Sequence, residues 1–379
     1  MTVLSSSVDS DLVQGIGARI GGEVDFFTTI SERQYRRWSA GGVPGRLWLR
    51  LAGWVGHPTR LALRLLSAPR GTTFVVTTNP FFAPALAAWL GAWRGHRVVH
   101  YVFDLYPDAL EAAGVIATAG FRSRVIAALT RSTQRRCNGA VYLGSSLQRH
   151  AETRHGRARR SAVIDVAADE SRFTASVRVK VPPLILHYGG QLGMMHDAAA
   201  LAEAVRQLQP EREAGTVGFN FRVGGARAGQ LLVFAGQPGI SAGPVLPAPE
   251  WRCSVHGMHV GLVSLTPAGA RVCLPSKTYA LFASGLAVLA VAPTGSDLAG
   301  IVDENSAGWV VDNSQNDHET CRPRDAAAVG ARIAALVRYL LQNPAEVRAR
   351  GQAAAQAATT RYGRTAIAGR WRQFLADIQ

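Results

Sequence analysis

The residue types best suited to chemistry lie in one stretch, residues 274–285, which reads LPSKTYALFASG. A proline cannot continue a regular element and Ser276 is a good helix N-cap, so the stretch predicts a loop followed by a short helix that ends at Gly285. The N–H groups at a helix start carry a partial positive charge, and Lys277 adds a full charge at the same place. The stretch therefore predicts an anion site for a phosphate or diphosphate.

The lysine is conspicuous because the rest of the basic residues are almost all arginine. Lys180 and Lys277 are the two lysines among 41 basic residues, which give a net charge of +15. An arginine-rich composition can reflect coding bias alone, but a retained lysine favours a site that needs a compact point charge. The net charge suits an anionic membrane or a phosphorylated substrate; a nucleic-acid partner is not expected, because aromatic residues are not interleaved with the basic ones.

A second candidate region follows a strand-like run at residues 97–103, RVVHYVF. In open α/β sheets ligands bind beyond the carboxyl ends of the strands, which is where Asp104 and Asp108 lie. His100, inside the strand, is a further candidate for acid–base chemistry. Two structural alternatives stay open: Asp108 equally suits the start of the next helix, and His100 suits a core histidine.

Glycine-rich turns follow two other strand-like runs. Residues 183–188 (PLILHY) lead into GGQLG at 189–193 and then a helix over 197–208, and residues 219–223 lead into Gly224 and Gly225. Such turns let backbone approach a ligand closely. The first turn departs from the GxGxxG dinucleotide fingerprint, and no acidic residue closes the next strand, so a nicotinamide cofactor is not expected.

Strands and helices alternate throughout, and 47% of the residues are hydrophobic, enough for two cores. The pattern predicts two α/β domains of the Rossmann-like class. We place the first at residues 1–168, a polar linker at 169–180, the second domain at 181–358 and a C-terminal helix at 359–379. A return of that helix to the first domain stays open.

Residues 46–66 form a basic amphipathic pattern, with Arg46, Arg50, Arg60 and Arg64 between apolar residues and an interruption at 56–58. Such a face suits the solvent side of a helix packed on a sheet, or peripheral contact with an anionic membrane, and both stay open. No apolar run is long enough to span a membrane. Four isolated cysteines and an N-terminus without a leader pattern indicate the cytoplasm, with no zinc site and no disulfide framework.

Three longer stretches carry a resemblance. HYGGQLGMMHDAAALAEAV, VFDLYPDALEAAGV and the segment from VGLVSL to GWVVD, spread over residues 70–360, resemble family-4-type glycosyltransferases of the GT-B fold, most closely those that make bacterial surface polysaccharides. The resemblance implies two Rossmann-like domains facing a cleft. It also implies transfer of a hexose, with retention, from a nucleoside diphosphate sugar to a hydroxyl of a glycan or lipid-linked acceptor, with no cofactor and no metal.

Carried onto this sequence, the resemblance gives the site residues. Catalytic roles fall to Lys277 and to Asp104, as base or positioning group; His100 is the third catalytic candidate, from its place in the strand before Asp104. Binding of the donor falls to residues that lie in the second domain: Gly189, Gly190, Gln191, Gly193, Arg222, Gly224, Pro275, Ser276, Lys277, Thr278 and Asp297.

The sequence departs from the family pattern in two places. Val272 and Ala280 stand where many members have two glutamates eight positions apart, so Asp297 or Glu304 would have to hold the ribose. Residues 191–196 lack the usual basic residue, for which Arg222 or Arg227 would compensate. Two alternatives therefore stay open: a catalytically reduced GT-B scaffold in a glycan assembly complex, and a sugar-nucleotide epimerase.

Overall fold

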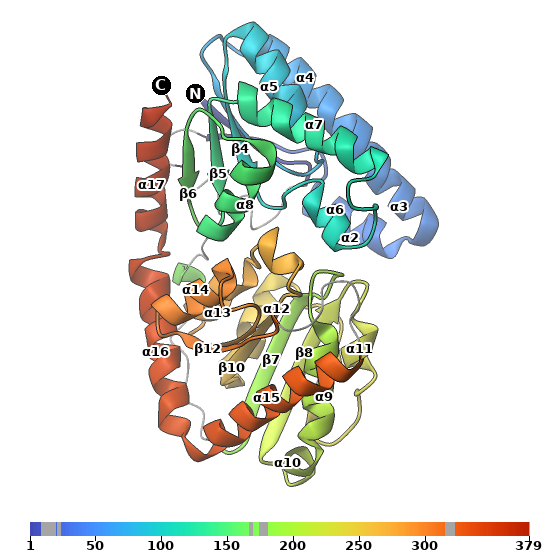
Figure 1. The fold of residues 1–379 in the computed structure, drawn as a ribbon, viewed down its shortest axis with the longest axis vertical. Coiled ribbons are helices and arrows are strands. Elements are labelled where there is room, and N and C mark those ends of the chain that lie inside the picture. Colours follow the sequence, from blue (N-terminus) through green and yellow to red (C-terminus); the bar gives the residue numbers. More distant parts are fainter. Residues whose placement is uncertain (9–19, 21–23, 167–169, 174–180, 315–322, 379) are drawn as a thin grey trace. The chain divides into compact units, whose positions relative to one another are not determined.

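A computed structural model of the chain describes residues 1–8, 20, 24–166, 170–173, 181–314 and 323–378. The chain divides into two compact units, one made of Met1–Val166 with Thr365–Gln379 and the other of Ala167–Arg364. Each unit is built on a six-stranded sheet of parallel strands, so the predicted pair of Rossmann-like α/β domains is confirmed (Figure 1). Most of the linker expected at 169–180 lies outside the described residues; Glu170–Arg172 forms a 3-10 turn.

The sheet of the first unit has the strand order β2-β1-β3-β4-β5-β6. Its strands are β1 (Thr2–Ser5), β2 (Val24–Phe27), β3 (Thr73–Thr77), β4 (Arg97–Val102), β5 (Gly139–Tyr142) and β6 (Ser161–Val163). The central strands are short apolar runs because helices cover both faces of the sheet, as in other parallel sheets. Phe74, Val75 and Val99 are fully buried.

The helices of this unit are α2 (Glu32–Ala40), α3 (Gly42–Leu51), α4 (His57–Ser67), α5 (Ala83–Arg94), α6 (Asp108–Ala112), α7 (Phe121–Arg136) and α8 (Ser145–His155). The sequence predicted an interruption of the helix at residues 56–58, and this prediction was wrong. A π-helical turn, Ala52–Gly56, instead joins α3 to α4 without a break. His57 donates its N–H to the carbonyl of Ala52, five residues back. This wider turn accommodates Pro58 without breaking the helix, because proline lacks the N–H that an α-helical turn would use.

The C-terminal helix α17 (Arg364–Asp377) packs on the sheet of the first unit (Figure 1). Trp371 is fully buried, with its ring edge-on to Tyr101 at 5.1 Å. A Cβ at position 139 would lie 2.5 Å from the Phe374 ring, so glycine there permits the close approach of α17 to β5. The boundary expected at 358/359 falls instead inside α16 (Pro344–Thr360), and the units divide at 364/365.

The sheet of the second unit has the order β12-β11-β10-β7-β8-β9. Its strands are β7 (Leu184–Gln191), β8 (Val217–Gly224), β9 (Ile240–Gly243), β10 (Val260–Ser264), β11 (Ala287–Val291) and β12 (Gly308–Val311). Counted within the unit, this is the doubly wound order 3-2-1-4-5-6, whose direction reverses between β7 and β10. Ligands of such sheets bind beyond the carboxyl ends of the strands at this reversal. The edge strand β9 was missed, because ISAG has no apolar run.

The helices of the second unit are α9 (Ala198–Gln207), α10 (Gln209–Glu213), α11 (Gly229–Leu232), α12 (Ala248–Ser254), α13 (Lys277–Ala283), α14 (Asp297–Glu304), α15 (Pro323–Gln342) and α16. Figure 1 shows α9 and α15 side by side. Gly330 allows this, because a Cβ there would lie 2.5 Å from the Cβ of Glu203. Within the described residues, no helix is both long and apolar enough to cross a membrane.

Candidate active site

The carboxyl ends of β7 and β10 bring two predicted regions together. Leu186 of β7 lies opposite Val260 of β10, so the loops that follow the two strands start as neighbours. Thr266 donates its N–H to the carbonyl of Met195 at 2.8 Å, which ties these loops to each other. The glycine loop after β7 and the loop after β10 that contains Pro275, Ser276 and Lys277, which we call the PSK loop, therefore share one end of the sheet. This is the point where the strand order reverses.

Lys277 reaches from the PSK loop to the end of β7. Its Nζ lies 3.4 Å from the carbonyl oxygen of Gln191 and 3.8 Å from the centre of the Tyr188 ring. Burial lowers the pKa of Lys277 to about 7. No carboxylate pairs with this ammonium group among the described residues. Its charge is therefore held by neutral groups and is available to an anion.

The neighbours of Lys277 differ from the prediction in detail. Ser276 has helical backbone angles and its hydroxyl does not cap α13, so the expected N-cap bond is absent from the described residues. Thr278 donates its N–H to the carbonyl of Pro275, so part of the predicted N–H array is already used within the loop. The Thr278 hydroxyl is buried without a partner in the structure, so it faces the interior rather than a ligand.

The strand β7 is longer than predicted, so the glycine-rich turn expected at residues 189–193 starts later. Gly189, Gly190 and Gln191 continue the strand and pair with Arg222, Val223 and Gly224 of β8, so the turn itself begins at Leu192.

Trp251 explains the glycine at position 189. A Cβ there would lie 2.4 Å from the Trp251 indole nitrogen and 2.7 Å from His187 Nε2. The space that a Cβ would need at position 189 is thus taken by these two side chains. Gly190 needs its positive φ of 106°, while Gly193 has open space around it.

Trp251 and His187 form a hydrogen-bonded pair under the end of β7. The Trp251 indole N–H donates to His187 Nε2 at 2.8 Å, so the ring proton sits on Nδ1 and faces Asn220 Oδ1 at 3.0 Å. Burial lowers the pKa of His187 to about 4, which keeps the ring neutral. Sequence reasoning missed this pair because α12, which carries Trp251, has no clear helical pattern.

Two arginines lie near the end of β8, one in the strand and one in the loop that follows it. Arg222 of β8 donates to the Ser241 hydroxyl at 3.1 Å, and its buried Nε has no partner in the described structure. Arg227 donates to the carbonyl of His196 at 2.9 Å. Both use neutral acceptors, and neither forms an ion pair with another described residue. Together with Lys277 they leave uncompensated positive charge at the end of the sheet.

The carboxylates proposed to hold a ribose lie apart from one another. Asp297 is the first residue of α14, where Ser296 caps the helix by accepting the N–H of Ala299 at 3.2 Å. Glu304 lies at the other end of α14 and pairs with Arg361 at 2.7 Å. Glu304 is therefore paired on the surface with Arg361, while Asp297 lies at the start of the helix.

The two acidic candidates of the first unit, Asp104 and Asp108, lie beyond β4. Asp104 follows the strand, its N–H donates to the Thr78 hydroxyl at 3.3 Å, and burial raises its pKa to about 6. His100 lies inside β4 and is 4% exposed; burial lowers its pKa to about 4. Its Nδ1 has no partner among the described atoms. The neutral, enclosed ring matches the core-histidine alternative more closely than a base.

Asp108 is the first residue of α6 and is tied to α8. Its carboxylate oxygens lie 2.8 Å from His150 Nε2 and 2.7 Å from His155 Nε2, and Arg154 pairs with it at 3.1 Å. Burial favours the neutral acid, but the hydrogen bonds from both histidines and the charges of His155 and Arg154 outweigh it and hold the pKa of Asp108 well below its usual range. Asp108 thus lies at the start of the next helix, as one of the two alternatives predicted. The tie from α6 to α8 was not indicated by the sequence.

No protein-family model matches the chain. Among curated proteins, it is 22% identical over 278 residues to the probable glycosyltransferase WbjE of Pseudomonas aeruginosa, a match that covers 70% of this chain and 66% of that protein. The chain thus spans slightly less than two thirds of that relative's length.

Solved structures of glycosyltransferases match over the whole chain. Sucrose-phosphate synthase of Thermosynechococcus elongatus superposes with a TM-score of 0.65 at 13% identity, covering 100% of this chain and 98% of that one. The UDP-forming α,α-trehalose-phosphate synthase of Burkholderia xenovorans gives 0.67 at 14% identity, covering 100% and 99%. HepE of Anabaena, solved with UDP-glucose, gives 0.67 at 11% identity and covers both chains completely. The chain has the GT-B fold.

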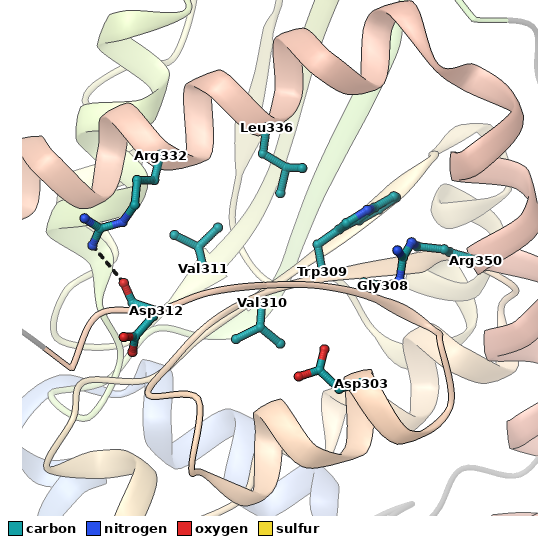
Figure 2. Close-up of a pocket in the computed structure, with 9 residues that line it drawn as sticks. All are labelled: Asp303, Gly308, Trp309, Val310, Val311, Asp312, Arg332, Leu336 and Arg350. Atoms are coloured by element: carbon teal, nitrogen blue, oxygen red, sulfur yellow. Dashed lines mark hydrogen bonds between the residues drawn. The ribbon is translucent and has the colours of Figure 1, made fainter.

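Within the GT-B fold, the pocket in Figure 2 lies away from these loops. It has a volume of about 560 Å³ and follows the outer edge of β12, which β11 separates from β10. Arg350 donates to the carbonyl of Gly308 at 2.6 Å and Arg332 to that of Asp312 at 2.8 Å, as Figure 2 shows for Arg332. Arg350 covers a carbonyl of the edge strand β12 and Arg332 covers the carbonyl of the residue that follows it, so both shield this edge from pairing with another strand, which is a structural role.

Proposed function

We propose that the protein is a glycosyltransferase that binds a nucleoside diphosphate sugar at the reversal point of its second unit. The observation that carries the proposal is the cluster of Lys277, Arg222 and Arg227, whose charges no described carboxylate neutralises. A diphosphate is the part of such a donor that this cluster suits. HepE, which shares the fold, was solved with UDP-glucose, and this supports UDP as the first nucleotide to test.

The chemical need in such a transfer is to stabilise the leaving diphosphate. The bond between the anomeric carbon and the diphosphate oxygen breaks, and a bond to the acceptor oxygen forms. In our proposal Lys277 and the hydroxyl of Ser276, which does not cap α13, face the developing charge, and preorganised donors of this kind lower the barrier without a metal. Asp104 of the first unit either accepts the proton of the acceptor hydroxyl or positions that hydroxyl. If Asp104 only positions it, the proton leaves with the diphosphate.

The finer assignments complete the proposal. The transfer is of a hexose with retention at the anomeric carbon, and the acceptor is a hydroxyl of a glycan, including a lipid-linked one, in surface polysaccharide synthesis. Gly190 and Gly193 leave room for the donor beside the loops, and Asp297 takes the ribose. The enzyme acts in the cytoplasm, with peripheral contact at the inner face of the membrane.

Calorimetric titration with UDP and UDP-glucose tests the donor site. Wild type should bind UDP saturably, and Lys277→Ala should weaken binding by roughly 10- to 100-fold, the worth of a charge-assisted hydrogen bond. The matched control is Arg348→Ala, which removes an exposed positive charge from α16 at a position without a described ion pair.

Equal binding by wild type and Lys277→Ala, or none by either, would contradict the proposed site. The second candidate, a GT-B scaffold without activity, is favoured specifically by Val272 and Ala280, which replace two carboxylates of the family pattern. It predicts that wild type binds neither UDP nor UDP-glucose. A panel of other nucleoside diphosphates separates that outcome from a different choice of base.

A further inference from the structure

The outer face of the first unit is formed by helices with unusually exposed apolar side chains. The helix pair α3–α4, joined by its π turn, lies beside α5, and α5 lies beside α7, so the helices form one layer on the sheet (Figure 1). The large apolar residues that are exposed on these elements are Val43, Leu47, Trp48, Leu51, Trp54, Val55, Leu63, Leu66, Trp89, Trp93, Phe121 and Val125. We call this set, with the arginines of the same helices, the outer helical face.

The exposure is greatest at α3 and at the ends of α5 and α7. In α3, Gly45 alone is buried, while Trp48 is 58% exposed. Trp93 is 73% exposed and Phe121 81%. Exposed apolar patches of this kind on a soluble unit mark interaction sites, because water around them is costly. A helix such as α3, which buries almost none of its apolar residues, is stabilised when another apolar phase covers it.

The charges on this face have one sign. The π-linked pair α3–α4 together with α5 and α7 contains ten arginines and no aspartate, glutamate or lysine. From residue 33 to residue 103 the sequence has no acidic residue at all. Arg64 pairs with Asp25 of β2, and Arg136 lies over the Trp89 ring at 3.7 Å, while Arg46 and Arg50 are exposed on α3. The partner must therefore be negative as well as apolar.

The combination of exposed apolar side chains and arginines shows which kind of partner fits this face. A second copy docking through the same face would bring ten arginines against ten arginines, so self-association there is disfavoured. A nucleic acid would satisfy the charges but not cover residues such as Leu47 and Leu51. An anionic bilayer supplies both phases: phosphate headgroups for the arginines, and an interfacial region in which tryptophan side chains are preferred.

We infer that the outer helical face docks on an anionic membrane leaflet, with Trp48 of α3 and Trp93 of α5 entering the interface and the arginines contacting headgroups. The inference adds α5 and α7, with their aromatic residues, to the segment 46–66, for which the sequence left membrane contact open as one of two alternatives. It rests on residues of the first unit alone and does not require the donor site. It would place a lipid-linked acceptor beside the enzyme.

Flotation with vesicles tests the inference on the full chain. Wild type should float with vesicles of phosphatidylcholine and phosphatidylglycerol at 7:3 and not with pure phosphatidylcholine, and the bound fraction should fall as salt rises. Trp48→Ala and Trp93→Ala should each reduce the partition coefficient by about tenfold, and the double variant by more than either alone. Arg46→Gln with Arg50→Gln should reduce it by roughly tenfold with anionic vesicles.

Two controls keep the test sharp. Val233→Ser and Arg348→Gln change an equally exposed apolar residue and an exposed arginine of the second unit, and should leave flotation unchanged. Trp48 and Trp93 are exposed, so their variants should keep the wild-type melting temperature and UDP affinity.

Three results would overturn the inference. These are no flotation of wild type, flotation that the tryptophan variants retain in full, and a dimer in analytical ultracentrifugation that Trp48→Ala dissociates while vesicle binding persists. Since UDP affinity is measured on the same variants, failure here is distinguishable from failure of the donor site.

Discussion

The ammonium group of Lys277 lies 3.8 Å from the centre of the Tyr188 ring, on a neighbouring element of the same unit. A cation–π contact positions a charge without neutralising it, whereas a carboxylate would cancel it. The ring thus holds Lys277 ready for an anion. Since burial lowers the pKa of Lys277 to about 7, its charge near neutral pH depends on what binds beside it.

The first prediction is that UDP binding weakens as pH rises from 7 to 9. Free Lys277 loses its proton in this range, while a bound diphosphate raises the lysine pKa, so binding takes up a proton. The dissociation constant should therefore increase by up to about tenfold per pH unit. Titration calorimetry in buffers with different ionisation enthalpies measures both the affinity and the proton uptake.

Lys277→Arg is the matched variant, because a guanidinium group stays protonated throughout this range. Its UDP affinity should be nearly constant from pH 7 to 9, whatever its absolute value. The UDP phosphate itself titrates near pH 6 and so contributes little. A wild-type profile as flat as that of the arginine variant would show that Lys277 does not change its protonation on binding.

The second prediction concerns the glycine at the end of β7. Gly189→Ala places a Cβ 2.4 Å from the Trp251 indole nitrogen, which displaces the indole and its hydrogen bond to His187. Overpacking of this kind costs about 1–3 kcal/mol. Urea denaturation monitored by circular dichroism should give that loss, and in a Trp251→Ala background the loss from Gly189→Ala should be clearly smaller.

Gly193→Ala is the control from the same region, since nothing lies closer than 4.0 Å to a Cβ there. It should fold with wild-type stability. If it nevertheless weakens UDP binding, the donor passes Gly193, as the family resemblance implies. Equal destabilisation by Gly189→Ala in both backgrounds would exclude contact with Trp251 as the reason for the glycine.

These two glycines illustrate what the sequence could and could not predict. Hydrophobic periodicity predicted most helices, and short apolar runs predicted both sheets. A strand that is buried on both faces is apolar along its whole length, so it can be recognised from the local sequence. They did not predict the use made of Gly189, since Trp251 is 62 positions away in the sequence. Ser276 was predicted as a cap from its type and place, but it has helical backbone angles and its hydroxyl does not cap α13.

The candidate site divides in the same way. The PSK loop and the carboxyl ends of the strands were predictable, because residue type and strand order restrict anion sites to few places. Side-chain partners were not: the sequence does not indicate that Tyr188 lies under Lys277, or that Glu304 is taken by Arg361. Such contacts depend on packing between elements that are far apart in the chain.

The third prediction is that Asp108 is a stabilising group of the first unit. Asp108→Ala leaves His150 and His155 without their shared acceptor and Arg154 with Glu111 as its one remaining described carboxylate partner, at a cost of about 3–5 kcal/mol. The pKa of Asp108 is held low, so its contribution is present above the ordinary value near 3.8 and is lost as pH falls below it. Urea denaturation should therefore show the difference from wild type at pH 7 and a smaller one at pH 3.

UDP affinity serves as the control, because the donor cluster lies in the other unit. It should be unchanged in Asp108→Ala at temperatures where the variant is folded. A variant as stable as wild type at pH 7 would mean that His150, His155 and Arg154 find other partners at no cost.

The last prediction concerns Asp104, whose pKa burial raises to about 6. The sign is opposite to that of Asp108: a raised pKa stabilises the fold below the unfolded value near 3.8, and this contribution is lost as pH rises through about 6. Asp104→Asn removes the buried charge, so its melting temperature should exceed that of wild type at pH 7.5 and approach it at pH 4. Scanning calorimetry at both values measures this. A carboxylate kept at a cost in stability is typical of a residue retained for chemistry. If the asparagine variant is no more stable at pH 7.5, the Asp104 carboxylate is not destabilised by burial, and the reason to assign it to the acceptor hydroxyl rather than to the fold is lost.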